Sequence, residues 1–215
     1  MINRLTDRLA RRRRVNRARK LGFTIVASNC WGATVYQDLG LEYQTPFVGL
    51  FLHPDCYLKL IDDLSLISSP MRFVETSRYP DAEADRQSNN AYPVGVLADD
   101  IEVHFVHDSD PDDALAKWQR RSARVNPDRL FLAFTDRDGA TEQHLQRFDA
   151  HPVDRKVCFT AQPHPHLSSV VPVPACAGKP CVDDLYANRR LVDACFDVPA
   201  WLNDDNPRRN KETAA

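Results

Sequence analysis

The sequence predicts a three-layer α/β protein, in which a mostly parallel sheet carries helices on both faces. Short, continuous apolar segments, such as residues 23–28 and 130–134, are typical of strands that are buried on both sides. Helical patterns separate these segments along the chain, and this alternation favours parallel strands joined by helical crossovers. With 215 residues, of which 43% are hydrophobic and 27% charged, the chain has the composition of an ordinary soluble globular protein.

Prolines and capping residues set the boundaries of the expected elements. Pro54 stands at an early helical position, where its missing N–H is tolerated, and Asp110 is a suitable N-cap for the helix that follows it. We expect strands at residues 23–28, 47–52, 72–75, 94–97, 101–107, 130–134 and 157–160. We expect helices at residues 2–20, 54–67, 111–124, 139–148 and 183–196, a mobile loop at 77–91 and irregular chain at 162–180.

We expect the chain to divide into a basic N-terminal helix (residues 1–20), a single α/β domain (21–202) and a disordered tail (203–215). No apolar run approaches the roughly 18 residues that span a bilayer, and the first residues are too polar for a secretory signal. The six cysteines are scattered along the chain, which suits a reduced protein better than a disulfide framework. These features predict a cytoplasmic location.

The basic N-terminal segment contrasts with an acidic body. The first 20 residues hold nine of the 28 lysines and arginines but one of the 30 acidic residues. Such a segment suggests an anionic partner, and three interpretations are open. It is a solvated helix that lies back on the acidic body, it attaches electrostatically to anionic lipid at the inner face of the membrane, or it binds nucleic acid, which the acidic body disfavours.

Polar residues stand where the expected strands end. They are Ser28 and Asn29, His53, His107 and Asp108, Thr135 and Asp136, and Thr160. In open parallel sheets, ligands bind beyond the carboxyl ends of the strands. The sequence therefore predicts a ligand site at this edge of the sheet.

The first of these strand ends carries Ser28, Asn29 and Cys30. Ser28 and Asn29 are candidates for capping the next helix or for binding a ligand. Cys30 is better interpreted as a buried thiol than as a nucleophile, because a nucleophile needs a positioned base. Gly32 stands alone here, so a glycine-rich phosphate loop is missing. That argues against a P-loop enzyme and against the usual dinucleotide fingerprint.

Two histidines belong to the segment at 101–107. Glu102 and His104 share one face of an extended strand, whereas His107 lies on the other face and at the strand end. His107 is therefore a candidate for acid–base catalysis or ligand contact, since a neutral imidazole exchanges a proton near pH 7. A structural role is the alternative. His104 is a further candidate for ligand binding.

A cationic stripe distinguishes the helix expected after Asp110. Lys117, Arg120, Arg121 and Arg124 recur at spacings that place four cations on one helical face. Arginine binds carboxylate and phosphate in a bidentate manner, so Arg120, Arg121 and Arg124 are candidates for binding an anionic ligand. Ion pairing with the acidic body is the alternative. Trp118 lies on a different face, and we expect it to anchor the helix in the core.

Two Asp-x-Asp triplets follow apolar strands, at residues 108–110 and 136–138. Two carboxylates at a strand end can hold Mg²⁺ or Mn²⁺ against a diphosphate, as in metal-dependent sugar-nucleotide transferases. Asp136 and Asp138 are the preferred metal candidates, although Asp138 is also a suitable N-cap. The PHPH segment at 163–166 and the pair Cys176 and Cys181 match no closed zinc pattern, so we expect loops there.

Six motifs resemble, in order, the bacterial domain-of-unknown-function family 1919: SNCWG, GLEYQTPFVGLFL, YPVG, DIEVHFVH, KWQRRSARVN and TDRDG. The resemblance spans about residues 22–160 and leaves out the basic segment and the proline-rich region after Ala161. Members of that family are often labelled exopolysaccharide or capsular polysaccharide biosynthesis proteins, which implies a link to polysaccharide synthesis. The family supplies no agreed catalytic residue. The matching positions are Ser28, Asn29, Trp31, Gly32, His104, His107, Lys117, Trp118, Arg120, Arg121, Asp136 and Asp138.

The expected function is glycosyl transfer from a sugar nucleotide in exopolysaccharide or capsular polysaccharide synthesis, with acyl transfer as a weaker candidate. Arg120, Arg121 and Arg124 would neutralise the diphosphate of the donor. His107 or Asp136 would act as the base on the acceptor hydroxyl. The alternative, from another class, is a non-catalytic accessory protein that binds an anionic glycan or another assembly protein.

Overall fold

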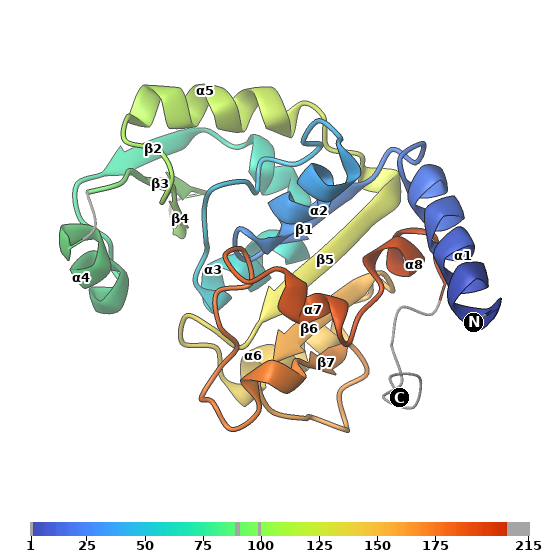
Figure 1. Ribbon diagram of the computed structural model, residues 1–215. Coiled ribbons are helices and arrows are strands. Elements are labelled where there is room, and N and C mark those ends of the chain that lie inside the picture. Colours follow the sequence, from blue (N-terminus) through green and yellow to red (C-terminus); the bar gives the residue numbers. More distant parts are fainter. Residues whose placement is uncertain (1, 89–90, 99, 206–215) are drawn as a thin grey trace.

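The computed structural model describes residues 2–88, 91–98 and 100–205, with side chains from Arg8 onward, and confirms the α/β class (Figure 1). Its described residues form two separate sheets. The parallel sheet has the strand order β1-β5-β6-β7, with β1 at Thr24–Ala27, β5 at Leu130–Thr135, β6 at Lys156–Thr160 and β7 at Val170–Pro172. The antiparallel sheet has the order β2-β3-β4, with β2 at Met71–Val74, β3 at Val94–Leu97 and β4 at Ile101–His104.

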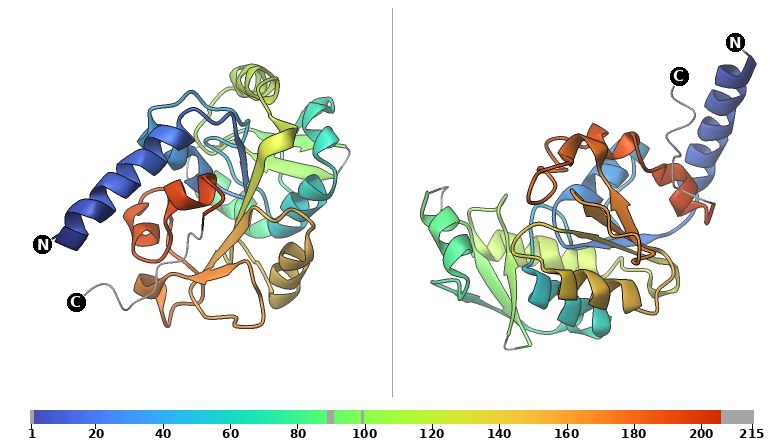
Figure 2. Two further views of the ribbon diagram at one scale, coloured as in Figure 1. Left: turned by 90° about the vertical axis from the view of Figure 1, so that its right-hand side faces the viewer. Right: turned by 90° about the horizontal axis from the view of Figure 1, so that it is seen from below.

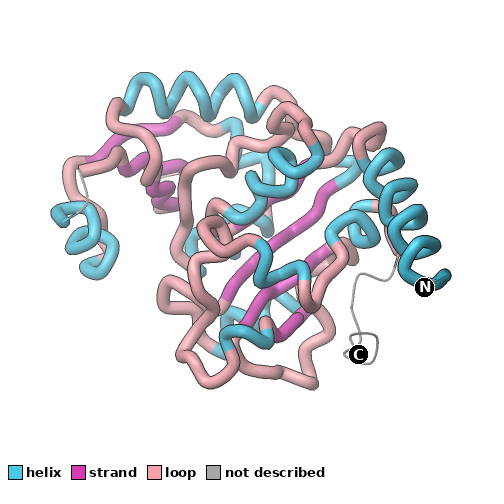
Figure 3. Tube along the Cα trace, viewed as in Figure 1, coloured by secondary structure: helices cyan, strands magenta, loops and turns pink. Residues whose placement is uncertain are grey.

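Helices surround both groups of strands, and loops cross the region between the groups (Figure 3). The α-helices are α1 Ile2–Ala18, α2 Trp31–Leu39, α3 Pro54–Asp62, α4 Pro80–Ser88, α5 Pro111–Ser122, α6 Glu142–Ala150, α7 Arg190–Asp193 and α8 Val198–Leu202. Short 3₁₀ helices cover Leu64–Ser68, Pro127–Arg129 and Pro174–Cys176.

The parallel sheet buries a hydrophobic core on each face, as the three-layer prediction requires. In β5, Phe131 packs into the core shared with α2, α7 and α8, whereas Leu132 packs into the core shared with α3 and α6. On the second face, the Tyr57 ring of α3 stacks on Phe134 with 5.3 Å between ring centroids. This alternation is expected of a strand covered on both sides, and the helices lie on both sides of the sheet in Figure 2.

The antiparallel sheet is covered by α5, and Trp118 is the anchor that the sequence predicts. Its indole is 2% exposed and contacts Phe47 and Phe105 edge-on, at centroid distances of 5.5 and 6.1 Å. The indole N–H donates to the carbonyl of Ile67 (3.0 Å), so the polar end of the ring is satisfied as well.

Residues 51–52 join the two sheets, and we call them the inter-sheet link. Phe51 exchanges two backbone hydrogen bonds with His104 at the end of β4, each 3.0 Å, and the N–H of Leu52 donates to the carbonyl of Ser28 after β1 (2.9 Å). The predicted strand at 47–52 is therefore wrong. Gly49 adopts a left-handed φ of 75°, which breaks the extended run and leaves a single bridge in place of a ladder.

The segment at 77–91, predicted as a mobile loop, instead contains α4. Arg86 is largely buried, and its guanidinium donates to the carbonyls of Glu75 (2.8 Å) and Tyr92 (3.0 Å). These bonds tie a polar helix to the chain on both sides of it. The composition of the segment resembles a loop because few of its side chains are apolar.

Other boundaries also differ from the prediction. The helix expected at 183–196 is reduced to α7, because the Asp184 carboxylate accepts the backbone N–H groups of Tyr186 (2.8 Å) and Ala187 (3.2 Å) and holds a turn. The helix expected at 54–67 ends earlier, at Asp62, and the helix expected at 139–148 begins later, at Glu142. Strand β7 lies within the region at 162–180 that was expected to be irregular.

The expected N-terminal helix is present as α1 and packs beside α8 (Figure 1). Val15 and Ala18 contact the core, and Arg14 forms an ion pair with Asp197 (3.2 Å). The helix therefore lies back on the body, as one of the three interpretations holds, while several of its arginines remain exposed. No helix among the described residues is long and apolar enough to cross a membrane.

The tail predicted at 203–215 starts too early. Asp204 forms ion pairs with Arg129 (3.1 Å) and Arg155 (2.6 Å), and the Asn203 amide donates to the carbonyl of Arg14 (3.0 Å). Residues 203–205 thus belong to the folded body. Residues 206–215 lie outside the described part of the chain.

Tyr57→Phe is expected to lower the free energy of unfolding by about 1–2 kcal/mol, because the buried carbonyl of Val26 loses the hydrogen bond from the Tyr57 hydroxyl (2.9 Å). Urea denaturation followed by circular dichroism measures the change. In the control Tyr43→Phe the lost hydroxyl accepts an exposed bond from Gln37 (3.1 Å), so stability should change by less than about 0.5 kcal/mol. Equal losses in both variants would contradict the role given to Tyr57.

Candidate functional site

An acidic cavity of about 550 Å³ opens at the carboxyl ends of β1 and β5, where α4 and the loop after β4 meet them. Its charged lining consists of Asp81, Asp85, Asp138, Asp184 and Arg137. The remaining walls come from Asn29, Cys30, Phe51, His53, Ala82, Val106, His107, Leu185 and Tyr186. The volume is typical of small-molecule sites, and the cavity lies at the sheet edge where the sequence predicts a ligand site.

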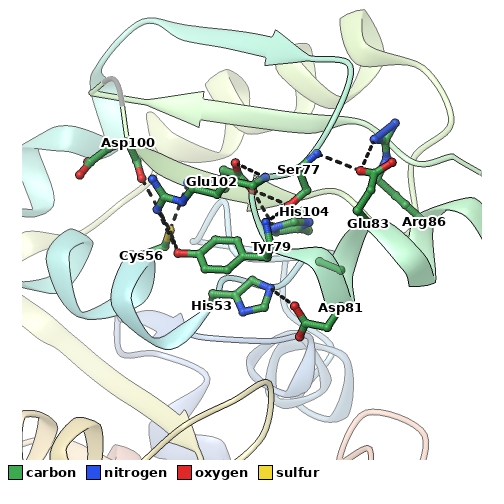
Figure 4. A network of polar contacts seen from close by, with 12 residues as sticks. His53, Cys56, Ser77, Tyr79, Asp81, Glu83, Arg86, Asp100, Glu102 and His104 are labelled. Carbon is green, nitrogen blue, oxygen red and sulfur yellow. Dashed lines mark hydrogen bonds and ion pairs between the residues drawn. The ribbon is translucent and has the colours of Figure 1, made fainter.

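Buried polar contacts hold α4 against the antiparallel sheet and place Asp81 at the cavity (Figure 4). The Glu83 carboxylate accepts the backbone N–H of Ser77 (2.9 Å) and the guanidinium of Arg86 (3.0 Å). The Ser77 hydroxyl in turn donates to Glu102 of β4 (2.7 Å). These carboxylates are therefore structural supports, and Asp81 is left facing the cavity.

His53 presents an almost fully buried imidazole to the acidic cavity. Its ring is stacked on Tyr79 at 3.7 Å, and its Nε2 lies 3.9 Å from Oδ1 of Asp81 (Figure 4). Burial lowers the pKa of His53, and the charges of Asp81 and Asp138 oppose that shift in part. A neutral ring follows. Within the described part of the chain its Nε2 is buried and has no hydrogen-bond partner.

His104 does not reach the cavity, and the prediction that it contacts a ligand is wrong. Its side chain is 0% exposed, stacked on Phe51 at 4.5 Å and edge-on to His53 at 5.5 Å. Burial, followed by repulsion from the neighbouring His53 ring when that ring is protonated, lowers the pKa of His104 to about 3. His104 is therefore a neutral core residue beside Glu102, whose Oε2 lies 3.5 Å from its Nε2.

Asp136 and Asp138 have different environments. Both carboxylate oxygens of Asp136 accept backbone N–H groups, from Ala161 (2.7 Å) and Val182 (2.8 Å), and so fasten the end of β5 to two neighbouring segments. Asp138 lines the acidic cavity and adopts a left-handed φ of 57°, a strained conformation for a residue with a side chain. Burial raises the pKa of Asp138, and the charges of Arg137 and His53 oppose the shift.

The metal prediction for Asp136 and Asp138 does not fit this geometry. The oxygens of Asp136 are occupied by backbone donors. Among the described residues, three potential metal ligands have their donor atoms within 4.8 Å of one another. That group contains neither Asp136 nor Asp138. Asp136 and Asp138 therefore do not fit a Mg²⁺ or Mn²⁺ site.

The segment after β1 forms one wall of the cavity. Ser28 is 3% exposed, and its N–H continues the ladder to Ala133 (3.1 Å), so it does not line the cavity. Asn29 does line it, and its Oδ1 accepts the N–H of Trp31 (3.1 Å), the first residue of α2, whose N-cap is Cys30. Burial raises the pKa of Cys30 to about 11, so Cys30 is a protonated thiol rather than a nucleophile.

A smaller basic cavity of about 160 Å³ adjoins the acidic one, and the two share His107 and Tyr186 as lining residues. Its cations are Lys117 and Arg121. Lys117 is paired with Asp108 in the wall (2.6 Å). The Arg121 guanidinium lies over the Tyr43 ring, 5.3 Å from its centroid, and burial lowers its pKa.

The predicted cationic stripe divides into residues with different roles. Arg124 forms an ion pair with Glu42 (2.6 Å), and Lys117 bonds a second carboxylate, that of Asp113 (2.6 Å). Ion pairing with the body, the alternative interpretation, therefore accounts for these two cations. Arg120 is exposed and lies outside both cavities, so Arg121 is the arginine of the three that faces a cavity.

His107 stands between the two cavities, and the backbone fixes its position. Its N–H donates to the carbonyl of Gly49 (3.2 Å). A Cβ at Gly49 would lie 3.2 Å from the Cβ of His107, and Gly49 has a left-handed φ, so glycine permits this close approach. The His107 ring lies 5.8 Å from that of Tyr186, which forms the opposite side of the boundary.

Sequence reasoning missed several residues of the acidic cavity. Asp81 belongs to a helix that was expected to be a loop, and Asp184 and Tyr186 come from a segment that was expected to be a regular helix. Arg137 is the middle residue of the triplet 136–138, where no sequence pattern indicates a role for it. For His53 a signal existed, because it is one of the polar residues expected at strand ends.

Comparisons with known proteins agree with the resemblance seen in the motifs and extend it. The model of the domain of unknown function DUF1919 matches residues 1–203, which includes the basic segment and the proline-rich region that the motifs left out. An uncharacterized protein of Haemophilus influenzae is 34% identical over 187 residues, which cover 85% of this chain and 84% of that protein.

His104→Phe is expected to flatten the pH dependence of stability. The pKa of His104 is about 3 in the folded protein, whereas an unfolded histidine has a pKa of about 6.5. Between these values the unfolded chain binds a proton that the folded chain does not. The free energy of unfolding of the wild type should therefore fall as the pH drops from about 6.5 towards 3, by on the order of a few kcal/mol.

Urea titrations at about pH 7 and about pH 4.5 compare the two proteins. His166→Gln serves as the control, because the His166 side chain is 58% exposed and its removal should leave the pH dependence steep. A wild type and a His104→Phe variant with parallel pH profiles would contradict a neutral, buried His104.

Proposed function

This chain belongs to the DUF1919 family, and from its two adjoining cavities of opposite charge we infer that it transfers a glycosyl group from a sugar nucleotide during exopolysaccharide or capsular polysaccharide synthesis. The observation that carries the proposal is that His107 and Tyr186 line both cavities. A donor that spans this boundary has its diphosphate among cations and its sugar among carboxylates, and its reacting bond lies beside His107.

The basic cavity suits the diphosphate. In the described residues, Arg121 uses Nη1 for the carbonyl of Val48 (3.4 Å), and the guanidinium has further N–H groups for phosphate oxygens. Lys117 is ion-paired with Asp108 and Asp113, so Arg121 is the cation that we expect to bind the phosphates. Both residues lie on α5, so a rigid element positions them.

The acidic cavity suits a sugar. Ionised carboxylates accept hydrogen bonds from hydroxyl groups, and four aspartates line this cavity. A phosphate group here would meet like charge, whereas a neutral sugar would not. The charge difference between the cavities therefore orients the donor in one direction.

The reaction needs a base beside the acceptor hydroxyl. As that oxygen forms its bond to the anomeric carbon of the donor, the bond from this carbon to the phosphate oxygen breaks and the diphosphate leaves. The hydroxyl proton passes to the base, which we place at Asp138 or His107. The raised pKa of Asp138 makes its carboxylate a better proton acceptor than an exposed one, and Asp138 replaces Asp136 in this role. Cys30, as a protonated thiol, gives no support to acyl transfer.

Arg121→Gln is expected to weaken binding of the donor about tenfold or more, since a hydrogen bond to a charged group contributes about 1.5–3 kcal/mol. The measurement is calorimetry with UDP-, GDP- and CMP-linked sugars, with and without Mn²⁺. Arg120→Gln is the matched control, because it removes the same charge one residue away, outside both cavities. The proposal fails if the wild type binds none of these donors at millimolar concentration, or if both variants lose the same affinity.

Asp138→Asn is expected to lower the rate of sugar transfer by about 10²-fold or more, with donor affinity nearly unchanged, because it removes proton transfer and preserves shape. A non-catalytic glycan-binding accessory protein gives a different pattern. In that case polysaccharide output survives Asp138→Asn and His107→Ala but is lost on charge reversal at Arg121. That pattern would replace the enzymatic proposal with the accessory one.

We further propose that α1 brings the protein to the inner face of the membrane by electrostatic attraction. Arg8, Arg11, Arg12 and Arg13 are exposed, and Leu9 is 50% exposed beside them. Basic residues near an anionic membrane surface contribute about 1 kcal/mol each. This placement would bring the cavities close to membrane-bound acceptors of polysaccharide synthesis.

Replacement of Arg8, Arg11, Arg12 and Arg13 by glutamine is expected to abolish co-sedimentation with phosphatidylglycerol vesicles at low salt. Wild-type binding should weaken as salt rises, because it is electrostatic. Vesicles of phosphatidylcholine alone are the control, and neither protein should bind them. Equal sedimentation of wild type and variant with anionic vesicles would contradict the proposal, as would a wild type that is retained on DNA but not on vesicles.

A further inference from the structure

Glu142, His164 and His166 form a compact group beyond the carboxyl ends of β5 and β6. Nδ1 of His164 lies 2.7 Å from Oε2 of Glu142, and Nε2 of His166 lies 2.7 Å from Oε1. All three potential ligand atoms lie within 4.8 Å of one another. Neither histidine lines the acidic or the basic cavity, so this group is separate from the proposed site of transfer.

The PHPH segment shapes the histidine side of the group. The N–H of Leu167 donates to the carbonyl of His164 (3.0 Å), which closes a four-residue turn with Pro165 at its second position. Proline fixes φ near the value that this position requires, so the turn is stiff before any ligand binds. The two histidines therefore stand at fixed places, one on each side of Pro165.

Both sides of the group are attached to α6. Glu142 is the first residue of the helix, and Thr141 precedes it in a capping box with His144. The turn is held by Leu167, which is buried in the core, and by the N–H of Ser169, which donates to Asp149 of the same helix (2.6 Å). The donor atoms are thus brought together by the fold and not by a mobile loop.

We propose that Glu142, His164 and His166 bind a divalent transition-metal ion of the zinc type. Two imidazoles and one carboxylate match the preference of Zn²⁺ for nitrogen and oxygen donors, whereas Mg²⁺ prefers oxygen alone. Metal–ligand bonds of about 2.0–2.1 Å in a tetrahedron place donor atoms roughly 3.3 Å apart, so the 2.7 Å contacts need a small opening. The fourth position is left to water or to another ligand.

The bound ion cross-links the turn after β6 to the start of α6. A metal that binds the folded chain and not the unfolded one stabilises the fold by mass action. This cross-link would hold the loops beyond β5 and β6 together. The same loops contain Asp136 and Ala161, whose N–H donates to the Asp136 carboxylate. The inference does not depend on the proposed transferase activity.

Calorimetric titration of the untagged protein with Zn²⁺ is expected to show one site, and Zn²⁺ should raise the melting temperature. His166→Gln and Glu142→Gln should each weaken that site at least about tenfold, since even changes to groups behind a metal ligand have effects of this size. His144→Gln is the matched control. It removes an imidazole from the same helix, and glutamine at this position preserves the capping box, so the affinity should not change.

Co²⁺ provides a second measurement that excludes the half-buried thiols of Cys30 and Cys181 as the source of the site. Its absorption spectrum should show low-symmetry imidazole and carboxylate ligation without a thiolate charge-transfer band. The proposal is overturned if the wild type binds no Zn²⁺ at millimolar concentration, if His166→Gln binds as tightly as His144→Gln, or if the thiolate band appears. Circular dichroism of each variant checks that it is folded, and the exposed position of His166 makes that variant a mild change.

Discussion

The inter-sheet link is the constraint on which the arrangement of this molecule depends. Phe51 and His104 exchange two backbone hydrogen bonds, and the N–H of Leu52 donates to the carbonyl of Ser28, which connects the end of β4 to the end of β1. The antiparallel sheet is thereby held beside the carboxyl edge of the parallel sheet. Because Ser28, Leu52 and His104 are buried, these bonds are protected from competition with water. Both cavities form where the two sheets meet.

Burial governs the chemistry that this junction supports. Burial lowers the pKa values of His53 and His104, so both rings are neutral, and it raises the pKa of Asp138. These groups therefore differ in proton affinity from the same side chains in water. Left-handed backbone at Gly49 and Asp138 lies on the two sides of the same region. Glycine adopts this conformation without strain, whereas at Asp138 it is strained, and such strain is often retained at functional sites. The acidic cavity takes Asp81 and Asp85 from α4 and Asp138 and Asp184 from loops, whereas the basic cavity takes Lys117 and Arg121 from α5.

Local patterns in the sequence predict the parts of the fold that depend on local chemistry. The buried strands, the Trp118 anchor and the Asp110 cap, whose carboxylate accepts the N–H of Asp113 (2.8 Å), follow from apolar runs and spacing. His107 lines both cavities, although the strand expected at 101–107 ends at His104 and belongs to the antiparallel sheet. The inter-sheet link is not predictable in this way, because its apolar residues resemble a strand and its pairing is long-range. Asp81 is missed because its helix is tied down by hydrogen bonds from Arg86 to the carbonyls of Glu75 and Tyr92, which no apolar pattern signals.

The most direct test of the central claim is an NMR titration of the labelled protein with UDP-glucose and the other nucleotide sugars. The account predicts that one of them shifts the resonances of Gly49, His107, Arg121 and Asp138 together, with a single saturation curve. Such a result would place one ligand across both cavities. Shifts confined to α1 or to the PHPH turn, with the cavity resonances unmoved at saturation, would contradict it.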